Sequence, residues 1–337
     1  MEPIVEQDRE GARLVVIIPA LNEEATIRDV IGRVPASMEG VSSIEVIVVD
    51  DGSTDRTAEY AREAGARVVS HPDNRGVGAA FATGIDAALR GGADVIVNMD
   101  GDGQFRPEDI PALVRPVLEG GYGFVTCTRF GNPDYVAEMP WVKRWGNRAM
   151  CRLVNWVIRG ARFTDVSCGF RAYSRDTALR LNLFGTFTYT QESFVDLAAK
   201  QVRMTEVPLQ VRGVRQHGKS RVASNLWKYA CETVPIILGA MRDTRPLRFF
   251  GLLALSFLIV GGILGGFVSI WWLYHHRTSP WTSLITIGAA CIIMGMLISV
   301  MALIADQLGR VKRTQEEILR LARARYYGLA DAEVRRR

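Results

Sequence analysis

The sequence predicts an α/β domain with a mainly parallel sheet, followed by two helices that are apolar enough to cross a membrane. Four runs rich in Val and Ile occur in the first hundred residues, at 13–20, 43–51, 66–70 and 93–100. Continuous apolar runs, rather than strict alternation, indicate strands that are covered on both faces. Helix-like segments separate these runs, which implies right-handed crossovers and parallel strands.

Two uncharged apolar stretches follow, at Phe249–Tyr274 and Trp281–Ala305. Each exceeds the ~20 residues with which a helix spans the hydrocarbon core of a bilayer. The linker between them is short, so we expect an antiparallel hairpin. The small residues of "GGILGG" would permit close helix packing within this hairpin or between the protomers of a homo-oligomer. A buried helical hairpin of a soluble protein is the alternative interpretation.

The charges around the hairpin predict its orientation. Three arginines precede the first stretch, and Arg310, Lys312 and Arg313 follow the second, whereas the linker carries only Arg277. The positive-inside rule therefore places both ends of the hairpin in the cytoplasm.

Charge and hydropathy together distinguish a nucleic-acid partner from an anionic membrane surface. The chain of 337 residues has a net charge of +5, and its basic residues gather at 203–248 and from Arg310 onward. Such a bias fits either nucleic acid or an anionic membrane surface. The two apolar stretches favour the membrane, so we expect no nucleic-acid partner. The first apolar segment is too short for a cleavable signal peptide. The five scattered cysteines have no metal-type spacing, and we expect reduced packing residues.

The four predicted strands end in, or lead into, polar and acidic residues. Ligands of open α/β sheets bind beyond the carboxyl ends of the strands, so these ends predict one binding edge. A single ending could be explained by helix capping, for example by Asn22, Thr26, Ser53, Thr54 or Asp55. Four endings in succession are harder to explain in that way. They read "IPALNEE", "VVDDGSTD", "HPDNRG" and "NMDGDGQF".

The last of these endings predicts a metal. Asp100 and Asp102 are separated only by Gly101, and two like charges this close repel unless something positive lies between them. We therefore expect a divalent metal ion that carries a nucleotide diphosphate, with a solvated Asp-Gly turn as the alternative. Two other nucleotide-binding motifs are not matched. The segment "GVGAAF" lacks the third glycine of a dinucleotide fingerprint, and no P-loop motif occurs.

The chain resembles the family 2 glycosyltransferases with an A-type (Rossmann-like) fold. It carries six of their motifs in the same order. The most similar members are the polyprenyl-phosphate sugar synthases of the dolichol-phosphate mannose synthase-like type, over roughly Leu14–Trp227. The resemblance implies a membrane-bound, metal-dependent, inverting transfer of a sugar from a UDP- or GDP-linked donor to polyprenyl or dolichyl phosphate. The motifs are "IPALNEE", "VVDDGSTD", "NRGVGAA", "MDGDGQFRPEDIP", "SCGFRAYSR" and "RQHGKSR".

The resemblance also implies roles for single residues on the donor side. Asp51 would accept a hydrogen bond from the base or ribose, and the backbone of Gly101 would lie near the ribose or phosphates. The residues that would line the base pocket are Pro19, Leu21, Glu23 and Val49. The residues that match a metal-binding Asp-x-Asp-x-Gln motif are Asp100, Asp102 and Gln104. Oxygen ligands of this kind suit Mg²⁺ or Mn²⁺.

Four residues would act on the reacting groups. Asp102 would act through the metal, and Arg129 and Arg215 would face the diphosphate. Glu192, next to Gln191, would contact sugar hydroxyls, unless it is only a helix-start carboxylate favoured by the dipole. Arg221 stands where the common family pattern has Lys, so it keeps the charge but offers a planar fork.

The segment before the hairpin suggests the acceptor. Residues 222–242 mix apolar and basic side chains and predict an interfacial helix anchored by Trp227 and Tyr229. The phosphate motif "RQHGKSR" adjoins this helix, so a lipid phosphate would reach the site without leaving its leaflet. A phosphomonoester with a second pKa of ~6 is already largely a dianion at neutral pH, which makes a strong general base less necessary. The alternative is a membrane anchor with no substrate role.

These patterns predict four parts: a cytoplasmic catalytic domain at 1–219, a juxtamembrane interfacial helix at 220–246, a transmembrane hairpin at 247–306 and a basic amphipathic tail at 307–337. The tail would lie on anionic headgroups.

Two other functions stay open at this point. A processive polysaccharide synthase would carry Gln-x-x-Arg-Trp and usually more spans, but "WVKRW" has Trp141 at the glutamine position. A non-catalytic nucleotide-sugar-binding membrane scaffold would have a degenerate site, whereas "DGDGQ" is intact.

Overall fold

The computed structural model describes residues 11–131, 146–148, 150–152, 154–155, 162–182, 189–212 and 246–329. The chain divides into two compact units. The first contains Met1–Ile237 and Leu319–Arg337, and the second contains Leu238–Ile318. The interfacial helix predicted at 220–246 lies outside the described residues, apart from its last position.

The first unit is built on a seven-stranded sheet with the order β3-β2-β1-β4-β6-β5-β7. Neighbouring strands are parallel except for β6, which is antiparallel to both β4 and β5. This confirms the mainly parallel sheet and all four strands predicted in the first hundred residues. The last three strands were not predicted. The strands are β1 Ala12–Ala20, β2 Val41–Asp50, β3 Arg67–Ser70, β4 Val95–Asn98, β5 Phe124–Thr128, β6 Arg171–Ser174 and β7 Met204–Pro208.

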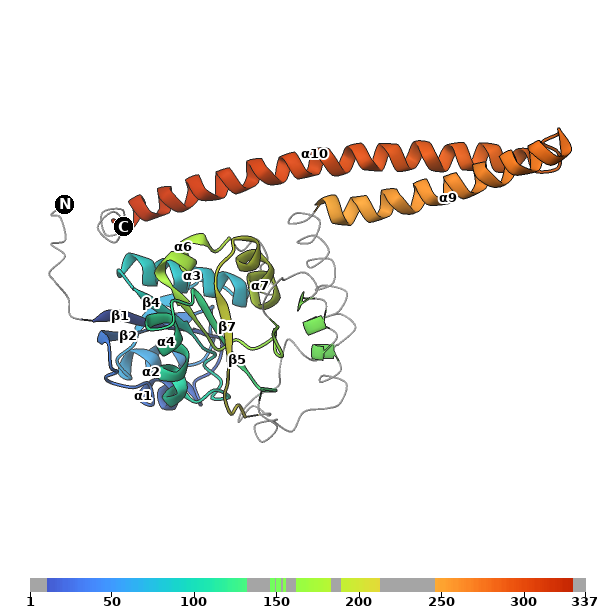
Figure 1. The fold of residues 1–337 in the computed structure, drawn as a ribbon. Coiled ribbons are helices and arrows are strands. Elements are labelled where there is room, and N and C mark those ends of the chain that lie inside the picture. Colours follow the sequence, from blue (N-terminus) through green and yellow to red (C-terminus); the bar gives the residue numbers. More distant parts are fainter. Residues whose placement is uncertain are drawn as a thin grey trace. The chain divides into compact units, whose positions relative to one another are not determined.

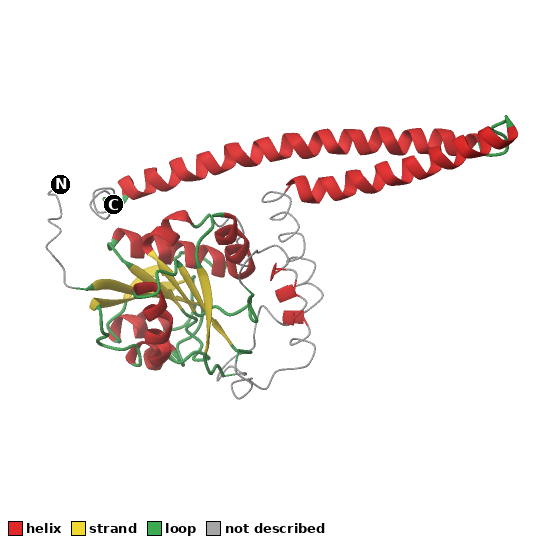
Figure 2. Cartoon of the chain, viewed as in Figure 1, coloured by secondary structure: helices red, strands yellow, loops and turns green. Residues whose placement is uncertain are grey.

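Helices cover both faces of this sheet (Figures 1 and 2). Helices α1, α2 and α4 lie on one face, and α3, α6 and α7 on the other. A short 3-10 helix, η1, begins at Pro107. The helices of this unit are α1 Ile27–Gly32, α2 Thr57–Glu63, α3 Val77–Arg90, η1 Pro107–Asp109, α4 Ile110–Leu118, α6 Arg175–Arg180 and α7 Tyr189–Ala199.

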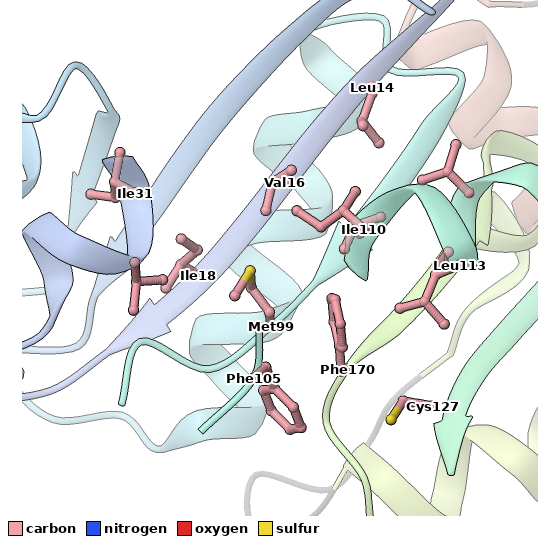
Figure 3. Close-up of a cluster of buried hydrophobic side chains, with 14 of the residues drawn as sticks. Leu14, Val16, Ile18, Ile31, Met99, Phe105, Ile110, Leu113, Cys127 and Phe170 are labelled. Carbon is pink, nitrogen blue, oxygen red and sulfur yellow. The ribbon is translucent and has the colours of Figure 1, made fainter. Parts of the chain in front are cut away.

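Strand β1 explains why its apolar run is continuous. Leu14, Val16 and Ile18 pack toward the face of α1 and α4 (Figure 3), and all three are 0% exposed. Ile17, which points to the opposite face, is equally buried because α3 covers it. A Cβ on Gly84 of α3 would lie 3.2 Å from Cβ of Ile17, so glycine permits this close approach. Each such burial stabilises the fold by about 1.5–3 kcal/mol.

The second unit is a pair of helices. Helix α9 runs from Pro246 to His275 and contains the first predicted span. Helix α10 begins at Thr282 and ends at Tyr326. By length and composition both are candidate membrane spans. Gly261 of α9 packs against α10, because a Cβ there would lie 2.8 Å from the carbonyl oxygen of Gly288. The expected close helix packing therefore occurs within the hairpin.

The tail predicted at 307–337 is not a separate element. Helix α10 continues from the apolar stretch to Tyr326, and its last turns from Leu319 belong to the first unit. Arg320, only 4% exposed, donates to Oδ1 of Asp176 at 3.1 Å. Arg323 Nη1 lies 2.8 Å from the carbonyl oxygen of Leu181. Arg320 and Arg323 therefore bind the carboxylate and the end of α6. The contact of the tail with headgroups stays a prediction.

The described cysteines agree with their predicted role. Each is a free thiol, and three of the four are buried. Cys231 lies outside the described residues.

Candidate active site

The polar loops at the carboxyl ends of the strands are joined by hydrogen bonds. Asn22, after β1, accepts a bond from the backbone N–H of Thr54, after β2, at 2.8 Å. Thr26 donates its hydroxyl to the carbonyl oxygen of Gly101, after β4, at 2.6 Å. The residues suspected as caps thus tie the loops of three strands together, which confirms the expected meeting of strand ends at one edge.

The loop at 100–104 is held between two apolar anchors. Met99 and Phe105 flank it and are both buried, and Figure 3 shows them packed below β1 beside Phe170. The rings of Phe105 and Phe170 have centroids 5.3 Å apart. A Cβ on Gly101 would lie 3.3 Å from side-chain atoms of Ile18 and Ile27. Glycine therefore separates the two carboxylates because this position presses onto the core.

The donor set of this loop fits a hard divalent cation. Asp100 is half-buried, Asp102 is 1% exposed, and Oδ1 of Asp102 accepts the backbone N–H of Gln104 at 3.0 Å. Over the described ranges, no three His, Cys, Asp or Glu side chains are grouped to hold a metal by themselves. Mg²⁺ keeps several waters and binds through one or two carboxylates plus substrate phosphates. Two aspartates and an amide oxygen therefore suffice for an ion that arrives with a diphosphate.

The residues predicted to line the base pocket lie at the ends of two adjacent strands. Pro19 of β1 is paired in register with Val49 of β2, and both are buried. Leu21 and Glu23 follow in the β1 loop, where the backbone N–H of Glu23 donates to the hydroxyl of Thr57 at 2.8 Å. The structure thus brings these residues together, and their contact with a base stays a prediction.

Asp51 follows directly after β2 and is 4% exposed. Its carboxylate accepts hydrogen bonds from the side chain of His71 and from the backbone N–H groups of Arg75 and Gly76. The loop after β3 is therefore fastened to the end of β2. The "HPDNRG" motif thereby joins the same edge as the other three endings.

Arg129, directly after β5, forms an ion pair with the fully buried Asp165. Its Nε and Nη2 atoms donate to the two carboxylate oxygens of Asp165 at 2.6 and 3.0 Å, and Nη2 also donates to Ser167 at 2.7 Å. Burial alone would lower the pKa of Arg129, but the Asp165 carboxylate outweighs burial and holds it above the ordinary value. In the part of the chain that the structure describes, Nη1 makes no hydrogen bond, so one arm of the fork can still meet a phosphate.

The other predicted residues are placed only in part. Glu192 lies in α7, although its side chain is outside the description. Arg215 and Arg221 are outside the described residues. The described stretch that contains β7 ends at Arg212, three residues before Arg215. The backbone N–H of Arg212 donates to the carbonyl oxygen of Gln104 at 3.1 Å. The described residues after β7, up to Arg212, therefore reach the 100–104 loop.

Sequence reasoning missed two residues of this edge, Asp165 and His71. Asp165 precedes the motif "SCGFRAYSR" and is 0% exposed, and its partner lies 36 positions away. The available signal was an acidic residue among Phe163, Val166 and Cys168, which does not by itself name the partner. His71 stands in the quoted "HPDNRG" motif but received no role.

The comparisons with known proteins agree with this geometry. The model of "Glycosyl transferase family 2" matches residues 15–180, which contain most of β1, strands β2 to β6 and the 100–104 loop. The chain belongs to this family. It is an enzyme family, so the chain is a glycosyltransferase with an A-type fold.

Two curated relatives and one solved structure illustrate the similarity. The UDP-N-acetylglucosamine–dolichyl-phosphate N-acetylglucosaminyltransferase of Methanococcus voltae is 28% identical, over 58% of this chain and 84% of that protein. The polyprenol monophosphomannose synthase of Mycolicibacterium smegmatis is 28% identical, over 66% and 87%. Glucosyl-3-phosphoglycerate synthase from Mycobacterium tuberculosis, in complex with Mn²⁺, uridine diphosphate and glucosyl-3-phosphoglycerate, has a TM-score of 0.52 and 27% identity, covering 68% of this chain and 80% of that one.

Proposed function

We propose that this glycosyltransferase moves a sugar from a nucleotide diphosphate sugar, UDP- or GDP-linked, to the phosphate of a polyprenyl or dolichyl lipid. The observation that carries the proposal is the loop at 100–104. Its two aspartates follow β4 at the edge where the loops after β1 and β2 also meet. The Mn²⁺ and uridine diphosphate in the solved relative support a nucleotide diphosphate as the donor's leaving group.

Asp100, Asp102 and Gln104 would hold Mg²⁺ or Mn²⁺ at this edge. When bound, the ion supplies positive charge that neutralises the leaving diphosphate. The positive charge of the ion would also offset the repulsion between the two aspartates. Their fixed loop, anchored by Met99 and Phe105, would keep the ligand oxygens in place before the donor arrives.

The chain's own residues would orient the rest of the donor. Pro19 and Val49 would form an apolar wall for the base. Asp51 would accept a hydrogen bond from it. Nη1 of Arg129 would donate to the diphosphate, and Asp165 would hold the guanidinium plane that aims it. Arg215 and Arg221 would add charge from the segment that follows Arg212.

The reaction would be a direct displacement. An oxygen of the lipid phosphate attacks the anomeric carbon from the side opposite the diphosphate. The bond between that carbon and the diphosphate oxygen breaks, and the configuration inverts. Because the phosphate is already largely a dianion at neutral pH, no general base has to remove a proton first. Glu192 would position sugar hydroxyls.

A lipid acceptor is favoured by two observations. The names of the two curated relatives describe a transferase for dolichyl phosphate and a polyprenol monophosphomannose synthase. The chain itself carries two helices that qualify as membrane spans by length and composition. With the basic residues on both outer sides of the hairpin, the catalytic unit would face the cytoplasm. Nothing lies within 4 Å of a Cβ placed at Gly262, so a second protomer of a homo-oligomer could pack there.

The test uses full-length protein in detergent with Mn²⁺ or Mg²⁺, polyprenyl phosphate and a panel of radiolabelled UDP- and GDP-sugars. We expect label in the organic phase from one donor, and none with EDTA. Parallel reactions contain 3-phosphoglycerate in place of the lipid. Transfer only to that acid would overturn the lipid acceptor, long water-soluble glycan would favour the processive synthase, and metal-dependent donor binding without transfer or hydrolysis would favour the scaffold.

A further inference from the structure

His71 lies directly after β3 and connects two elements of the site edge. It is buried, with 8% of its surface exposed. Its Nδ1 lies 2.7 Å from Oδ1 of Asp51, and its Nε2 lies 2.9 Å from Oγ1 of Thr83 in α3. The imidazole thus bridges the end of β2 and the helix that covers the sheet.

The chemistry of the partners fixes the direction of the bond to Asp51. An ionised carboxylate can only accept, so Nδ1 of His71 carries a hydrogen and donates it to Asp51. The hydroxyl of Thr83 can donate or accept, so it holds Nε2 whichever form the imidazole takes. One face of α3 therefore orients the ring, and the ring orients the carboxylate.

The hydrogen bonds of Asp51 leave one acceptor position on a known atom. Oδ1 accepts from His71 and from the backbone N–H of Arg75 at 3.0 Å, while Oδ2 accepts from the backbone N–H of Gly76 at 2.8 Å. Each carboxylate oxygen has two lone pairs. Oδ1 is thus saturated, and no residue of the described ranges fills the second position of Oδ2.

The loop that supplies these N–H groups has no room to shift toward β2. Gly52 follows Asp51 with a φ of +77°, and a Cβ there would lie 2.6 Å from the carbonyl carbon of Asp73. The two loops are therefore packed backbone to backbone. His71 is the side chain that fixes the carboxylate within this contact.

We propose that His71 is a positioning residue for base recognition, which directs the remaining acceptor of Asp51 toward a ring N–H of the donor nucleotide. The inference rests on the proposed function, in which Asp51 meets the base. Uracil (N3–H) and guanine (N1–H) both have such a ring N–H, whereas cytosine and adenine have a bare ring nitrogen at the corresponding place. The site therefore accepts UDP or GDP and rejects CDP and ADP.

Two substitutions separate positioning from simple packing. His71→Asn removes the ring but keeps an amide N–H close to the place of Nδ1. His71→Gln also removes the ring, but its amide reaches the place of Nε2 and leaves Oδ1 of Asp51 without this donor. A purely structural role predicts similar losses for both variants, since both open space between β3 and α3.

The experiment measures calorimetric binding of UDP and of GDP, each with Mn²⁺, to the full chain in detergent, with CDP as the base control. For the nucleotide that the wild type binds, we expect His71→Gln to weaken affinity about tenfold, as for the loss of one charge-assisted hydrogen bond. His71→Asn should stay within about threefold of the wild type. Equal losses in the two variants would overturn the proposal.

A double-mutant cycle supplies a second measurement. In an Asp51→Asn background the positioned carboxylate is already gone, so adding His71→Gln should weaken binding no further. Additive losses contradict positioning. If His71→Gln does not fold, Thr83→Val replaces it, with an expected loss of about threefold that again vanishes in the Asp51→Asn background.

The proposed function and this inference fail in different ways. A wild type that binds neither UDP nor GDP with Mn²⁺ refutes the nucleotide donor itself. A wild type that binds one of them, with His71→Gln binding equally well, refutes only the role of His71. Equal binding of CDP refutes the ring N–H as the recognised group.

Discussion

The sheet and the helical pair use similar apolar residues in opposite ways. Ile17 in β1 is 0% exposed, whereas Ile263 in α9 is 65% exposed and Leu303 in α10 is 61% exposed. In the sheet, helices from the same chain cover both faces. In the helical pair the two helices meet along a narrow line near Gly261 and leave most apolar side chains uncovered.

The difference in exposure indicates that the same types of apolar side chain have different surroundings in the two units. A soluble protein rarely exposes a continuous apolar patch larger than a few hundred Å². Lipid tails cover such side chains as well as a protein core does, so a helix in a bilayer needs no further protein layer. The sheet unit carries the polar edge and its chemistry, and the helical pair would carry the attachment to the membrane.

The sharpest contrast concerns activity. Asp102→Ala removes a predicted metal ligand from the sheet unit, and we expect sugar transfer to fall about a thousandfold or more, because a metal supplies several kcal/mol of charge stabilisation. Asp306→Ala, which removes a carboxylate of α10 paired with Arg310, should leave transfer near the wild-type rate. The assay measures labelled sugar in the organic phase. Wild-type turnover in Asp102→Ala would refute the assignment of the 100–104 loop.

A second contrast concerns stability. Ile17→Ala leaves a cavity under α3 and should destabilise the sheet unit by about 2–5 kcal/mol, lowering its Tm by about 5–15 °C. Ile263→Ala truncates the same side chain where it is exposed, and its Tm should change by less than about 2 °C. Thermal unfolding in detergent, followed by circular dichroism, measures both. Similar shifts for the two variants would mean that protein covers Ile263 after all.

A third contrast lies within the helical pair. A Cβ at Gly261 would lie 2.7 Å from Cγ1 of Ile292, while nothing lies within 4 Å of a Cβ at Gly262. Gly261→Ala should therefore overpack the contact and weaken the hairpin by about 1–3 kcal/mol. Gly262→Ala should be neutral or stabilising, since alanine favours a helix more than glycine does. Unfolding by sodium dodecyl sulfate in mixed micelles compares them. A loss in Gly262→Ala alone would place a contact between protomers there.

The smallest effect concerns the end of α10, where Tyr327 donates to Asp86 at 2.6 Å. Burial alone would raise the pKa of Asp86, but hydrogen bonds from Arg90 and Tyr327 hold it below its usual value. The native state then binds fewer protons than the unfolded chain as the pH passes through the carboxyl range. The contribution of Asp86 is therefore present above about pH 5 and is lost as the pH falls through the lowered pKa.

The measurement compares Tm values from pH 7 to pH 3. At pH 7 we expect Asp86→Asn to lower Tm by only about 1–3 °C, because the carboxylate is partly exposed. The difference from the wild type should shrink toward pH 3. Tyr327→Phe removes one of the two hydrogen bonds to Asp86, so its Tm should lie between the Tm values of the wild type and of Asp86→Asn. A constant difference over this range would contradict the link to the carboxylate charge.

The sequence alone determined the parts of the protein that depend on pattern. Unbroken Val and Ile runs predicted the first four strands because both faces of a parallel sheet are buried. The length of the uncharged stretches predicted α9 and α10, and the polar strand endings predicted the edge at which the loops meet. The antiparallel β6 escaped prediction, since strand direction depends on neighbours that are distant in the chain.

Only the tertiary structure decided which side chains became partners. The contact of Arg129 with Asp165, the bridge from Asp51 through His71 to Thr83, and the docking of Arg320 on Asp176 join residues that are 12 to 144 positions apart. Local pattern carries no information on such pairs, because a charged or polar side chain looks the same in sequence whether water or a buried partner satisfies it. The fold chooses the partner, since burial makes an unsatisfied charge costly and so requires one.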